Sequence, residues 1–246
     1  MPSGHWLCII PLKSVFMKKN VPFLSFCFIL IISFSCSHKY YTAADFEEKT
    51  LEHKLVAVIP AEMIFTGKQP KNLSAEDIAK MEEQESEDFQ FALYNSILRH
   101  ANSGKYITTI NFQDINLTRK LLEQNGISAR KCWELNDQEL KKYLGVDAVI
   151  KMRVQKQRYM SDEASYGITV AKQIITNTGI GSKVPVPYVR NRTNDIYASC
   201  NLISEGQTLW NDNYKSSSDY NSPANLIIEG ITDNFGKHFP YKKKRK

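Results

Sequence analysis

The sequence lacks the short motifs that identify most nucleotide-binding, metal-binding and serine-hydrolase proteins. It has no Walker-type loop and no nucleophile elbow, and its one Gly-x-Gly stretch, residues 179–181, leads into prolines and not into a helix. The histidines that follow residue 35, at positions 38, 53, 100 and 238, include no pair with metal-ligand spacing. We therefore expect no catalytic residues, no cofactor and no bound metal.

Long apolar runs are also scarce, and the one substantial run lies near the N-terminus. Residues 21–34 are mostly apolar, follow the basic segment 17–20 and are too few for a spanning helix, which needs roughly 20. A basic start, a short apolar run and small residues at its end are the parts of a cleaved export signal. We predict a signal peptide over residues 1–35, with Met17 as the true start.

Small residues and a cysteine close this segment. The junction Ser35-Cys36, preceded by Ser33 and Phe34, resembles the lipobox of bacterial lipoproteins, in which a small residue precedes the acylated cysteine. The resemblance implies that the mature chain begins at a lipidated Cys36, carries palmitate and faces the periplasm from the outer membrane. An ordinary secreted protein and an uncleaved signal anchor are the alternatives.

The net charge of +6 does not indicate a broad basic surface. Residues 242–246 are all basic, the predicted signal contains three further lysines, and the remainder of the chain is slightly acidic. A nucleic-acid partner is therefore not expected. The C-terminal charges are interpreted as a solvated, frayed terminus, with a weak attraction to anionic lipid headgroups as the alternative.

The rest of the pattern predicts one mixed α/β domain. Residues 36–52 are interpreted as a lipidated tether, residues 53–241 as the domain and residues 242–246 as a basic tail. Residues 55–59 are apolar on both faces, which suits a central strand covered from both sides. Pro60 is expected to end this strand.

A long helix is predicted next. Ser74 and Asp77 suit a capping box at its start, and it extends to about residue 102. Its apolar stripe at i, i+4 spacing contains Met81, Phe89, Leu93 and Ile97. The acidic stretch 82–88 lies where the helix dipole favours negative charge, and it is interpreted as a solvated face and not as a metal site.

Alternation, capping residues and glycines predict the remaining elements. They are a strand over 106–113, helices over 117–125 and 136–145, a strand over 146–158, a hairpin over 195–215 and a helix over 222–239. In the strand at 146–158, Lys151, Arg153 and Gln155 are expected to face outward. The order β-α-β-α-α-β-β-β-α predicts a mixed sheet of about five strands with helices packed on it.

The insertion at residues 160–192 separates two functional hypotheses. A pore subunit would need membrane strands of about 9–11 residues here. Lys172 would then face lipid, and Pro185 and Pro187 could not donate to the second strand. Helical spacing of the small and apolar residues fits better, so a helix is predicted over residues 163–177.

Two groups of residues have both a chemical and a structural interpretation. Ser128 and Lys131 match the Ser-x-x-Lys pattern of penicillin-interacting enzymes, but the partner motifs are missing, so a polar loop between helices is preferred. Trp133, Trp210 and Tyr214 suit a sugar-binding platform or, more often, a core.

Three cysteines follow residue 35. With Cys36 acylated, Cys132 and Cys200 remain as one potential pair in a disulfide-permissive compartment. Cys200 lies in a predicted strand, where a lone cysteine is usually a small buried side chain, so two free thiols are predicted.

Three segments carry a wider resemblance: 55–60 (LVAVIP), 144–150 (LGVDAVI) and 206–210 (GQTLW). With the element order, they resemble a group of bacterial envelope lipoproteins that includes the curli secretion channel subunit and the lipoprotein activator of a penicillin-binding protein. The resemblance covers about residues 52–241. It implies an α/β domain that acts in assembly and not in catalysis.

We therefore expect a membrane-anchored periplasmic accessory or assembly factor that binds other envelope proteins and is not an enzyme. A homo-oligomer is one possible form. The alternatives are an oligomeric pore-forming secretion subunit and an envelope hydrolase.

Overall fold

Strands and helices follow one another in a mixed α/β order. The computed structural model describes residues 40–69, 73–161, 164, 166, 168–171, 173, 193–219 and 221–245. Its elements are β1 (Tyr41–Thr42), α2 (Phe46–Lys49), β2 (Leu55–Val58), β3 (Glu62–Gly67), α3 (Ala75–Ala101), β4 (Tyr106–Thr108), β5 (Asn111–Phe112), α4 (Ile115–Gln124), α5 (Ala129–Glu134), α6 (Asp137–Leu144), β6 (Ala148–Arg158), β7 (Asn194–Ser204), β8 (Gln207–Ser218), α8 (Ala224–His238) and β9 (Lys242–Lys244). All belong to one unit of the chain, Tyr40–Lys246. The predicted fold class is confirmed.

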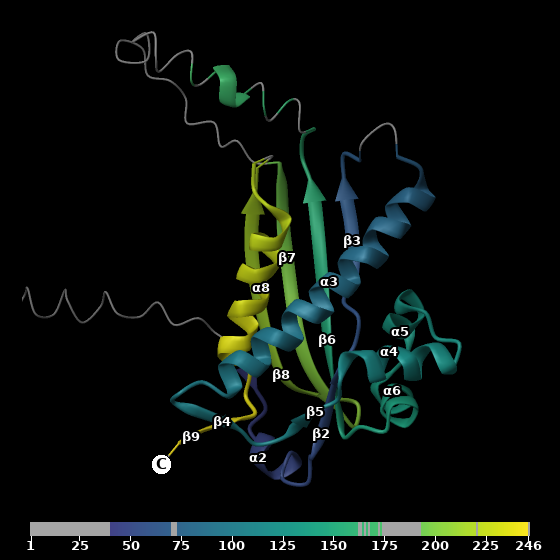
Figure 1. Ribbon diagram of the computed structural model, residues 1–246, viewed down its shortest axis with the longest axis vertical. Coiled ribbons are helices and arrows are strands. Elements are labelled where there is room, and N and C mark those ends of the chain that lie inside the picture. The colour runs from purple at the N-terminus through teal and green to yellow at the C-terminus, as the bar shows by residue number, and fades with distance from the viewer. Residues whose placement is uncertain are drawn as a thin grey trace, which may run out of the picture. The chain divides into compact units, whose positions relative to one another are not determined.

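The long strand β6 lies in the middle of a seven-stranded mixed sheet with the order β1-β8-β7-β6-β2-β5, and β3 also pairs with β6. β2 pairs in parallel with the first half of β6 and β3 with the second half, so both lie along the same edge (Figure 1). Pro60 lies in the short break between them, as predicted. The sequence pattern missed β3, which has 6 residues and follows directly after this break.

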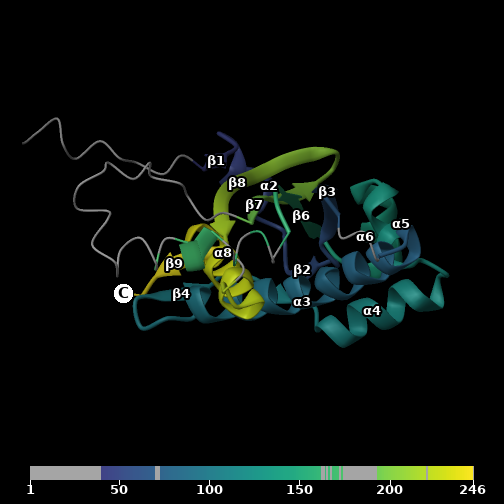
Figure 2. The same ribbon diagram turned by 90° about the horizontal axis from the view of Figure 1, so that it is seen from above.

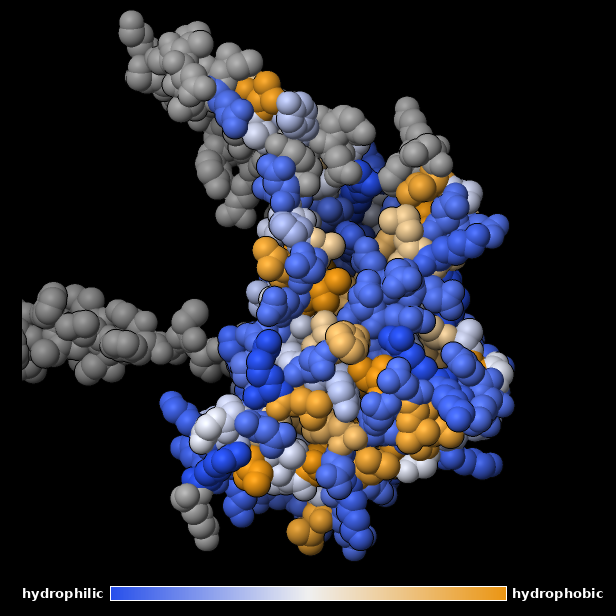
Figure 3. All heavy atoms as spheres, viewed as in Figure 1, coloured by the Kyte–Doolittle hydropathy of each residue, from blue (hydrophilic) through white to orange (hydrophobic). Residues whose placement is uncertain are grey.

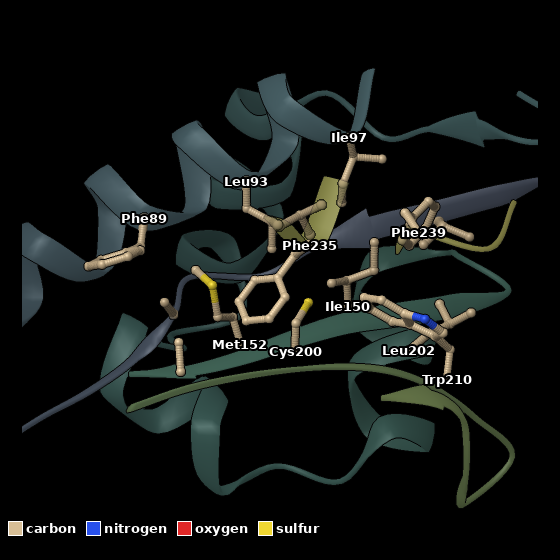
Figure 4. Packing of buried hydrophobic residues seen from close by; sticks show 14 of the residues in the cluster. Phe89, Leu93, Ile97, Ile150, Met152, Cys200, Leu202, Trp210, Phe235 and Phe239 are labelled. Carbon is tan, nitrogen blue, oxygen red and sulfur yellow. The ribbon is translucent and has the colours of Figure 1, made fainter. Parts of the chain in front are cut away.

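Helices α3 and α8 cover one face of the sheet (Figures 1 and 2). Figure 4 shows the resulting core, in which helix side chains pack on the strands below: Phe89, Leu93, Ile97 and Phe235 above Ile150, Met152 and Cys200. The stripe predicted on α3 is therefore confirmed over most of its length. Met81 is 41% exposed, because the first turns of α3 extend past the edge of the sheet (Figure 1).

Helices α4, α5 and α6 form a second layer beside β2 and β5 (Figure 1). Their buried residues Leu122, Cys132 and Leu140 pack with Ala57 and Val149 of the sheet. Asn136 and Glu139 form a capping box at the start of α6, and Gly145 ends that helix with a left-handed φ of 66°. This end of the sheet is consequently buried on both faces.

The loop predicted at Ser128 is a helix start instead. The Ser128 hydroxyl accepts a hydrogen bond from Lys131 N at 3.3 Å and caps α5. The prediction of a polar loop was wrong because this helix is only 6 residues long, too short for a clear apolar period.

β7 and β8 form the predicted hairpin. Glu205 and Gly206 have φ values of 53° and 73°, as a two-residue turn between twisted strands requires. Pairing extends from Asn194↔Ser218 to the turn, with a bulge near Leu202. Gly206 N donates to Asp137 Oδ2 at 2.9 Å, which attaches the tip of the hairpin to α6.

Two segments that were predicted to lie outside the domain pair with it. Within the predicted tether, β1 pairs with β8, and Phe46 of α2 packs against the core. Within the predicted frayed tail, β9 pairs antiparallel with β4. The strand predicted over 106–113 divides into β4 and β5, since β4 joins β9 and β5 joins β2.

The insertion between β6 and β7 is described in part. Within the helix predicted over 163–177, residues 164, 166, 168–171 and 173 are helical. Lys172, residues 179–192, the predicted signal peptide, Cys36 and His38 lie outside the described residues. Across the described parts of the chain, no helix is both long and apolar enough to cross a membrane.

Candidate functional site

One sheet face is covered over only part of its area. α4, α5 and α6 pack over β2 and the first residues of β6, whereas side chains further along β6, β7 and β8 reach solvent. Strand register aligns them in three rows, each running toward β8: Lys151, Asn201, Asn211; Glu62, Arg153, Ser199, Asn213; Ile64, Gln155, Tyr197, Lys215. We call this surface the open face.

A groove of about 350 Å³ lies where the open face meets α5. Trp133 forms one wall, and its indole N–H donates to Pro60 O at 3.1 Å, which fixes the ring. Ser199 and Asn201 lie along the sheet side of the groove. The groove therefore combines an aromatic wall with a polar floor, a mixture typical of binding sites.

Amide side chains form a chain of hydrogen bonds across β7 and β8. Asn211 Nδ2 donates to Asn201 Oδ1, and Asn213 Nδ2 donates to Asn211 Oδ1, each at 2.7 Å. Each amide keeps hydrogen-bonding capacity after these contacts, because a carboxamide has two donor hydrogens and an acceptor oxygen. The open face thus presents oriented donors and acceptors to solvent.

The charged groups on this face are held by neighbours. Arg153 forms an ion pair with Glu62, and the Lys215 ammonium lies 4.6 Å above the Tyr197 ring. Lys151 Nζ donates to Leu135 O at 2.6 Å, and burial lowers the pKa of this ammonium. These contacts position cations at both ends of the amide chain.

A second polar cluster, at the base of the sheet, contains a serine, a histidine and a lysine. Ser204 Oγ accepts from Lys141 Nζ at 3.0 Å and donates to Asp147 O at 2.9 Å, whereas His53 Nε2 is 3.5 Å away. The shorter contact assigns the hydroxyl proton to a backbone carbonyl, so the imidazole does not activate this serine as a base would. The cluster joins the hairpin, α6 and the strand entries.

Ser128 and Lys131 also lack the arrangement of a nucleophile and its base, because Ser128 caps the helix in which Lys131 lies. His100 contacts Asp233, and His238 contacts the buried Asp212. Within the described residues no group of three or more histidine, cysteine or acidic side chains is arranged to hold a metal ion.

The acidic stretch of α3 is more than a solvated face. Glu82, Glu85 and Glu87 form ion pairs with Arg130, Lys156 and Arg119, respectively. These pairs attach α3 to α5, β6 and α4.

The candidate platform aromatics lie in or against the core, and both described cysteines are buried. Trp210 is fully buried and Tyr214 packs against the core, so these two rings do not form a sugar platform with Trp133. Cys132 and Cys200 are buried and unpaired, as predicted. Burial raises the pKa of the Cys132 thiol to about 12, and it also raises the pKa of Cys200.

The sequence pattern indicates part of the open face but not all of it. The outward residues Lys151, Arg153 and Gln155 were predicted from alternation along β6. Ser199 and Asn213 follow the same alternation on the hairpin, so their place on the open face could also have been predicted. The position of Trp133 could not have been predicted, because only the three-dimensional packing of α5 brings this residue to the groove.

No protein-family model matches the chain, and no curated protein matches it. Similar solved structures include lipoprotein GNA1162 from Neisseria meningitidis, with 13% identity and a TM-score of 0.36 over 74% of this chain and 97% of the other. The PelC dodecamer from Paraburkholderia phytofirmans has 7% identity and a TM-score of 0.37 over 81% and 92%. The LpoB C-terminal domain from Salmonella enterica has 9% identity and a TM-score of 0.31 over 68% and 84%. Values this low assign no function to this chain.

Proposed function

We propose that this chain is a lipid-anchored protein of the bacterial outer membrane that faces the periplasm and binds another envelope protein without catalysing a reaction. The open face is the observation that supports the binding part of this proposal. It presents aligned amides, a tyrosine and paired cations beside an aromatic groove. The helices packed on the opposite sheet face keep this surface in shape before a partner arrives, which lowers the entropy cost of binding.

The lack of an activated nucleophile among the described residues favours binding over turnover. Ser204 donates to a backbone carbonyl, and Ser128 caps a helix. Purified protein covering residues 37–246 is expected to release no product from peptidoglycan, esters or nucleotides. Turnover that disappears in Ser128→Ala, Lys131→Ala or Ser204→Ala would favour the hydrolase alternative.

The anchoring part of the proposal depends on the Ser35-Cys36 junction. Two or more acyl chains on Cys36 would give stable attachment, at about 0.8 kcal/mol for each buried methylene. We expect Cys36→Ser to release the protein from membranes or to block its processing. Intact-mass spectrometry of the wild type tests this directly, since an unmodified N-terminus other than Cys36 would contradict the proposal.

The binding part is tested by filling the groove. Ser199→Trp adds a large ring to the groove floor, whereas Asn116→Trp adds the same ring to the exposed side of α4. Each variant and the wild type are tagged and recovered from solubilised membranes of the native bacterium, and captured proteins are compared by quantitative mass spectrometry.

The wild type and Asn116→Trp are expected to capture the same envelope protein, and Ser199→Trp is expected to lose it. Equal capture by all three forms would show that the open face is not the binding surface. Circular dichroism and thermal unfolding of the two variants establish that both remain folded.

A further inference from the structure

The basic C-terminal segment forms an ordered ribbon with β4. β9 pairs antiparallel with β4, with Tyr106 opposite Lys244 and Thr108 opposite Lys242, and Arg245 N donates to Lys105 O at 3.0 Å. Since side chains alternate along strands, one face of this ribbon carries Lys105, Ile107, Lys243 and Arg245. Ile107 is 47% exposed. An apolar residue among three cations on one face of a strand pair suits the interface between lipid headgroups and water.

The ribbon is strongly basic. Its cations are Lys105, Lys242, Lys243, Lys244 and Arg245, and among the described residues no carboxylate lies within ion-pair distance of any of them. Nearby cations outside the ribbon differ, because Arg99 and Lys237 both pair with Asp233. Figure 3 shows strongly hydrophilic residues at the lower left, where β4 and β9 lie in Figure 1.

The same end of the molecule receives the chain from the proposed anchor. The Tyr40 ring stacks on His238, the last residue of α8, with 5.3 Å between ring centroids. Lys242, the first residue of β9, donates from Nζ to the carbonyl of Lys237, the residue before that histidine. Cys36 precedes Tyr40 by four residues, which span at most about 14 Å when fully extended.

We propose that the ribbon rests on the anionic phospholipid headgroups of the bilayer that holds Cys36, and that it fixes the orientation of the domain on the membrane. The proposal rests on the proposed function for the lipid at Cys36. Acyl chains already supply attachment, so the ribbon's contribution is to stop the domain from pivoting on its short connection. Basic side chains attract anionic lipid when they lie within about one Debye length of the surface, which is about 8 Å at physiological salt.

The test uses the unacylated chain from Ser37 to Lys246, because residues 40–246 form a unit with its own core. Sedimentation with phosphatidylglycerol-rich vesicles and with phosphatidylcholine vesicles measures binding. We expect binding to the anionic vesicles alone and its loss at high salt. In the triple variant Lys105→Gln, Lys243→Gln, Arg245→Gln, affinity is expected to fall on the order of 100-fold, since each basic residue near a membrane contributes roughly fivefold.

A matched triple variant removes the same charge elsewhere: Lys120→Gln, Lys131→Gln, Lys142→Gln, three exposed lysines of α4, α5 and α6. It is expected to bind within about threefold of the wild type, because these residues lie outside the ribbon. Failure to bind anionic vesicles, equal binding to phosphatidylcholine, or an equal loss in both triple variants would overturn the proposal. Because this protein carries no lipid, an unacylated Cys36 in cells would leave these results unchanged.

Tryptophan fluorescence tests whether the ribbon itself contacts the lipid. The emission of Ile107→Trp is expected to move to shorter wavelength with phosphatidylglycerol vesicles, whereas Leu117→Trp on α4, a position with similar exposure at 46%, is expected to stay unchanged. A shift in both reporters or in neither would also overturn the proposal.

Discussion

The two ends of the sheet differ in the number of faces that they bury. At the β2 end, Ala57 and Val149 are covered by α4, α5 and α6, while Val58 and Ile150 are covered by α3 and α8. Along the hairpin, Ala198 and Cys200 are buried under the helices, but Tyr197 and Ser199 reach solvent. The covered end therefore contributes to the stability of the fold, and the open end provides the solvent-exposed surface that is proposed to bind a partner.

β6 runs from the region that is covered on both faces into the region with one solvated face, and its pattern of apolar residues changes along the way. Residues 148–150 are three consecutive buried apolar residues, and from Lys151 onward buried and more exposed positions alternate up to Val154. A continuous apolar run is what a strand needs when both faces are covered, and alternation is what it needs when one face is solvated. We therefore expect side-chain truncations of similar size to change the free energy of unfolding by very different amounts at the two ends.

The largest effect is expected at the covered end. Leu140 of α6 is fully buried in the second cluster, so Leu140→Ala should lower the free energy of unfolding by about 3 kcal/mol through lost burial and a cavity. Chemical denaturation measures this change. On the open face, Gln155→Ala should change the free energy of unfolding by less than about 0.5 kcal/mol. Equal losses at both positions would contradict the distinction between the two ends.

A second, smaller effect is expected where α8 crosses α3. A Cβ at Gly236 would lie 2.5 Å from Ser96 Oγ and 2.8 Å from its backbone, so Gly236→Ala should cost about 2 kcal/mol. Gly230, on the same helix, has no atom within 4 Å of the same position, and Gly230→Ala should be stabilising by about 0.5 kcal/mol. Thermal unfolding of both variants distinguishes this contact from a general effect of alanine on α8.

Much of this architecture was predictable because it depends on neighbours in sequence. The capping boxes at Ser74 and Asn136 and the turn at Gly206 are local, and each appears where the pattern indicates. The pairings of β1 with β8 and of β9 with β4 were not predictable, since short polar segments carry no apolar period. The groove depends on Trp133 meeting β6 and β7, which only the packing of α5 determines.

A third effect depends on pH and also concerns the attachment of α8. Asp233 accepts contacts from Lys237, His100 and Arg99. Although partial burial opposes ionisation, these hydrogen bonds lower the pKa of the Asp233 carboxyl well below its usual range. A carboxylate with a lowered pKa in the folded state stabilises fully above its unfolded pKa of about 4 and loses this contribution as pH falls further.

We therefore expect Asp233→Asn to be less stable than the wild type by about 1 kcal/mol at neutral pH. The difference should narrow as the pH falls from about 4 toward 2. Urea titrations of both proteins at a series of pH values measure it. A difference that stays constant with pH would assign the loss to packing and not to the charge.

The smallest effect is expected at the outer edge of the open end. β1 pairs with β8 only at Trp210 and Asn211, and no described strand pairs with the outer edge of β8 beyond them. Asn213 N donates to the side chain of Asp212 at 2.8 Å and not to a strand. This contact indicates that the backbone N–H groups of odd-numbered residues in this part of β8 point away from β7, toward the outer edge. By alternation, the N–H of Ser217 points to this edge and that of Ser216 points to β7.

Proline substitutions at Ser217 and Ser216 distinguish the unpaired edge of β8 from the edge that pairs with β7. Ser217→Pro removes an N–H without a strand partner and should cost less than about 1 kcal/mol, whereas Ser216→Pro removes a ladder hydrogen bond and should cost about 3 kcal/mol. Denaturation midpoints measure both. A large loss at Ser217 would mean that this edge is already paired, by another part of the chain or by a second copy. Light scattering of the wild type would then distinguish the two, because pairing with a second copy doubles the mass.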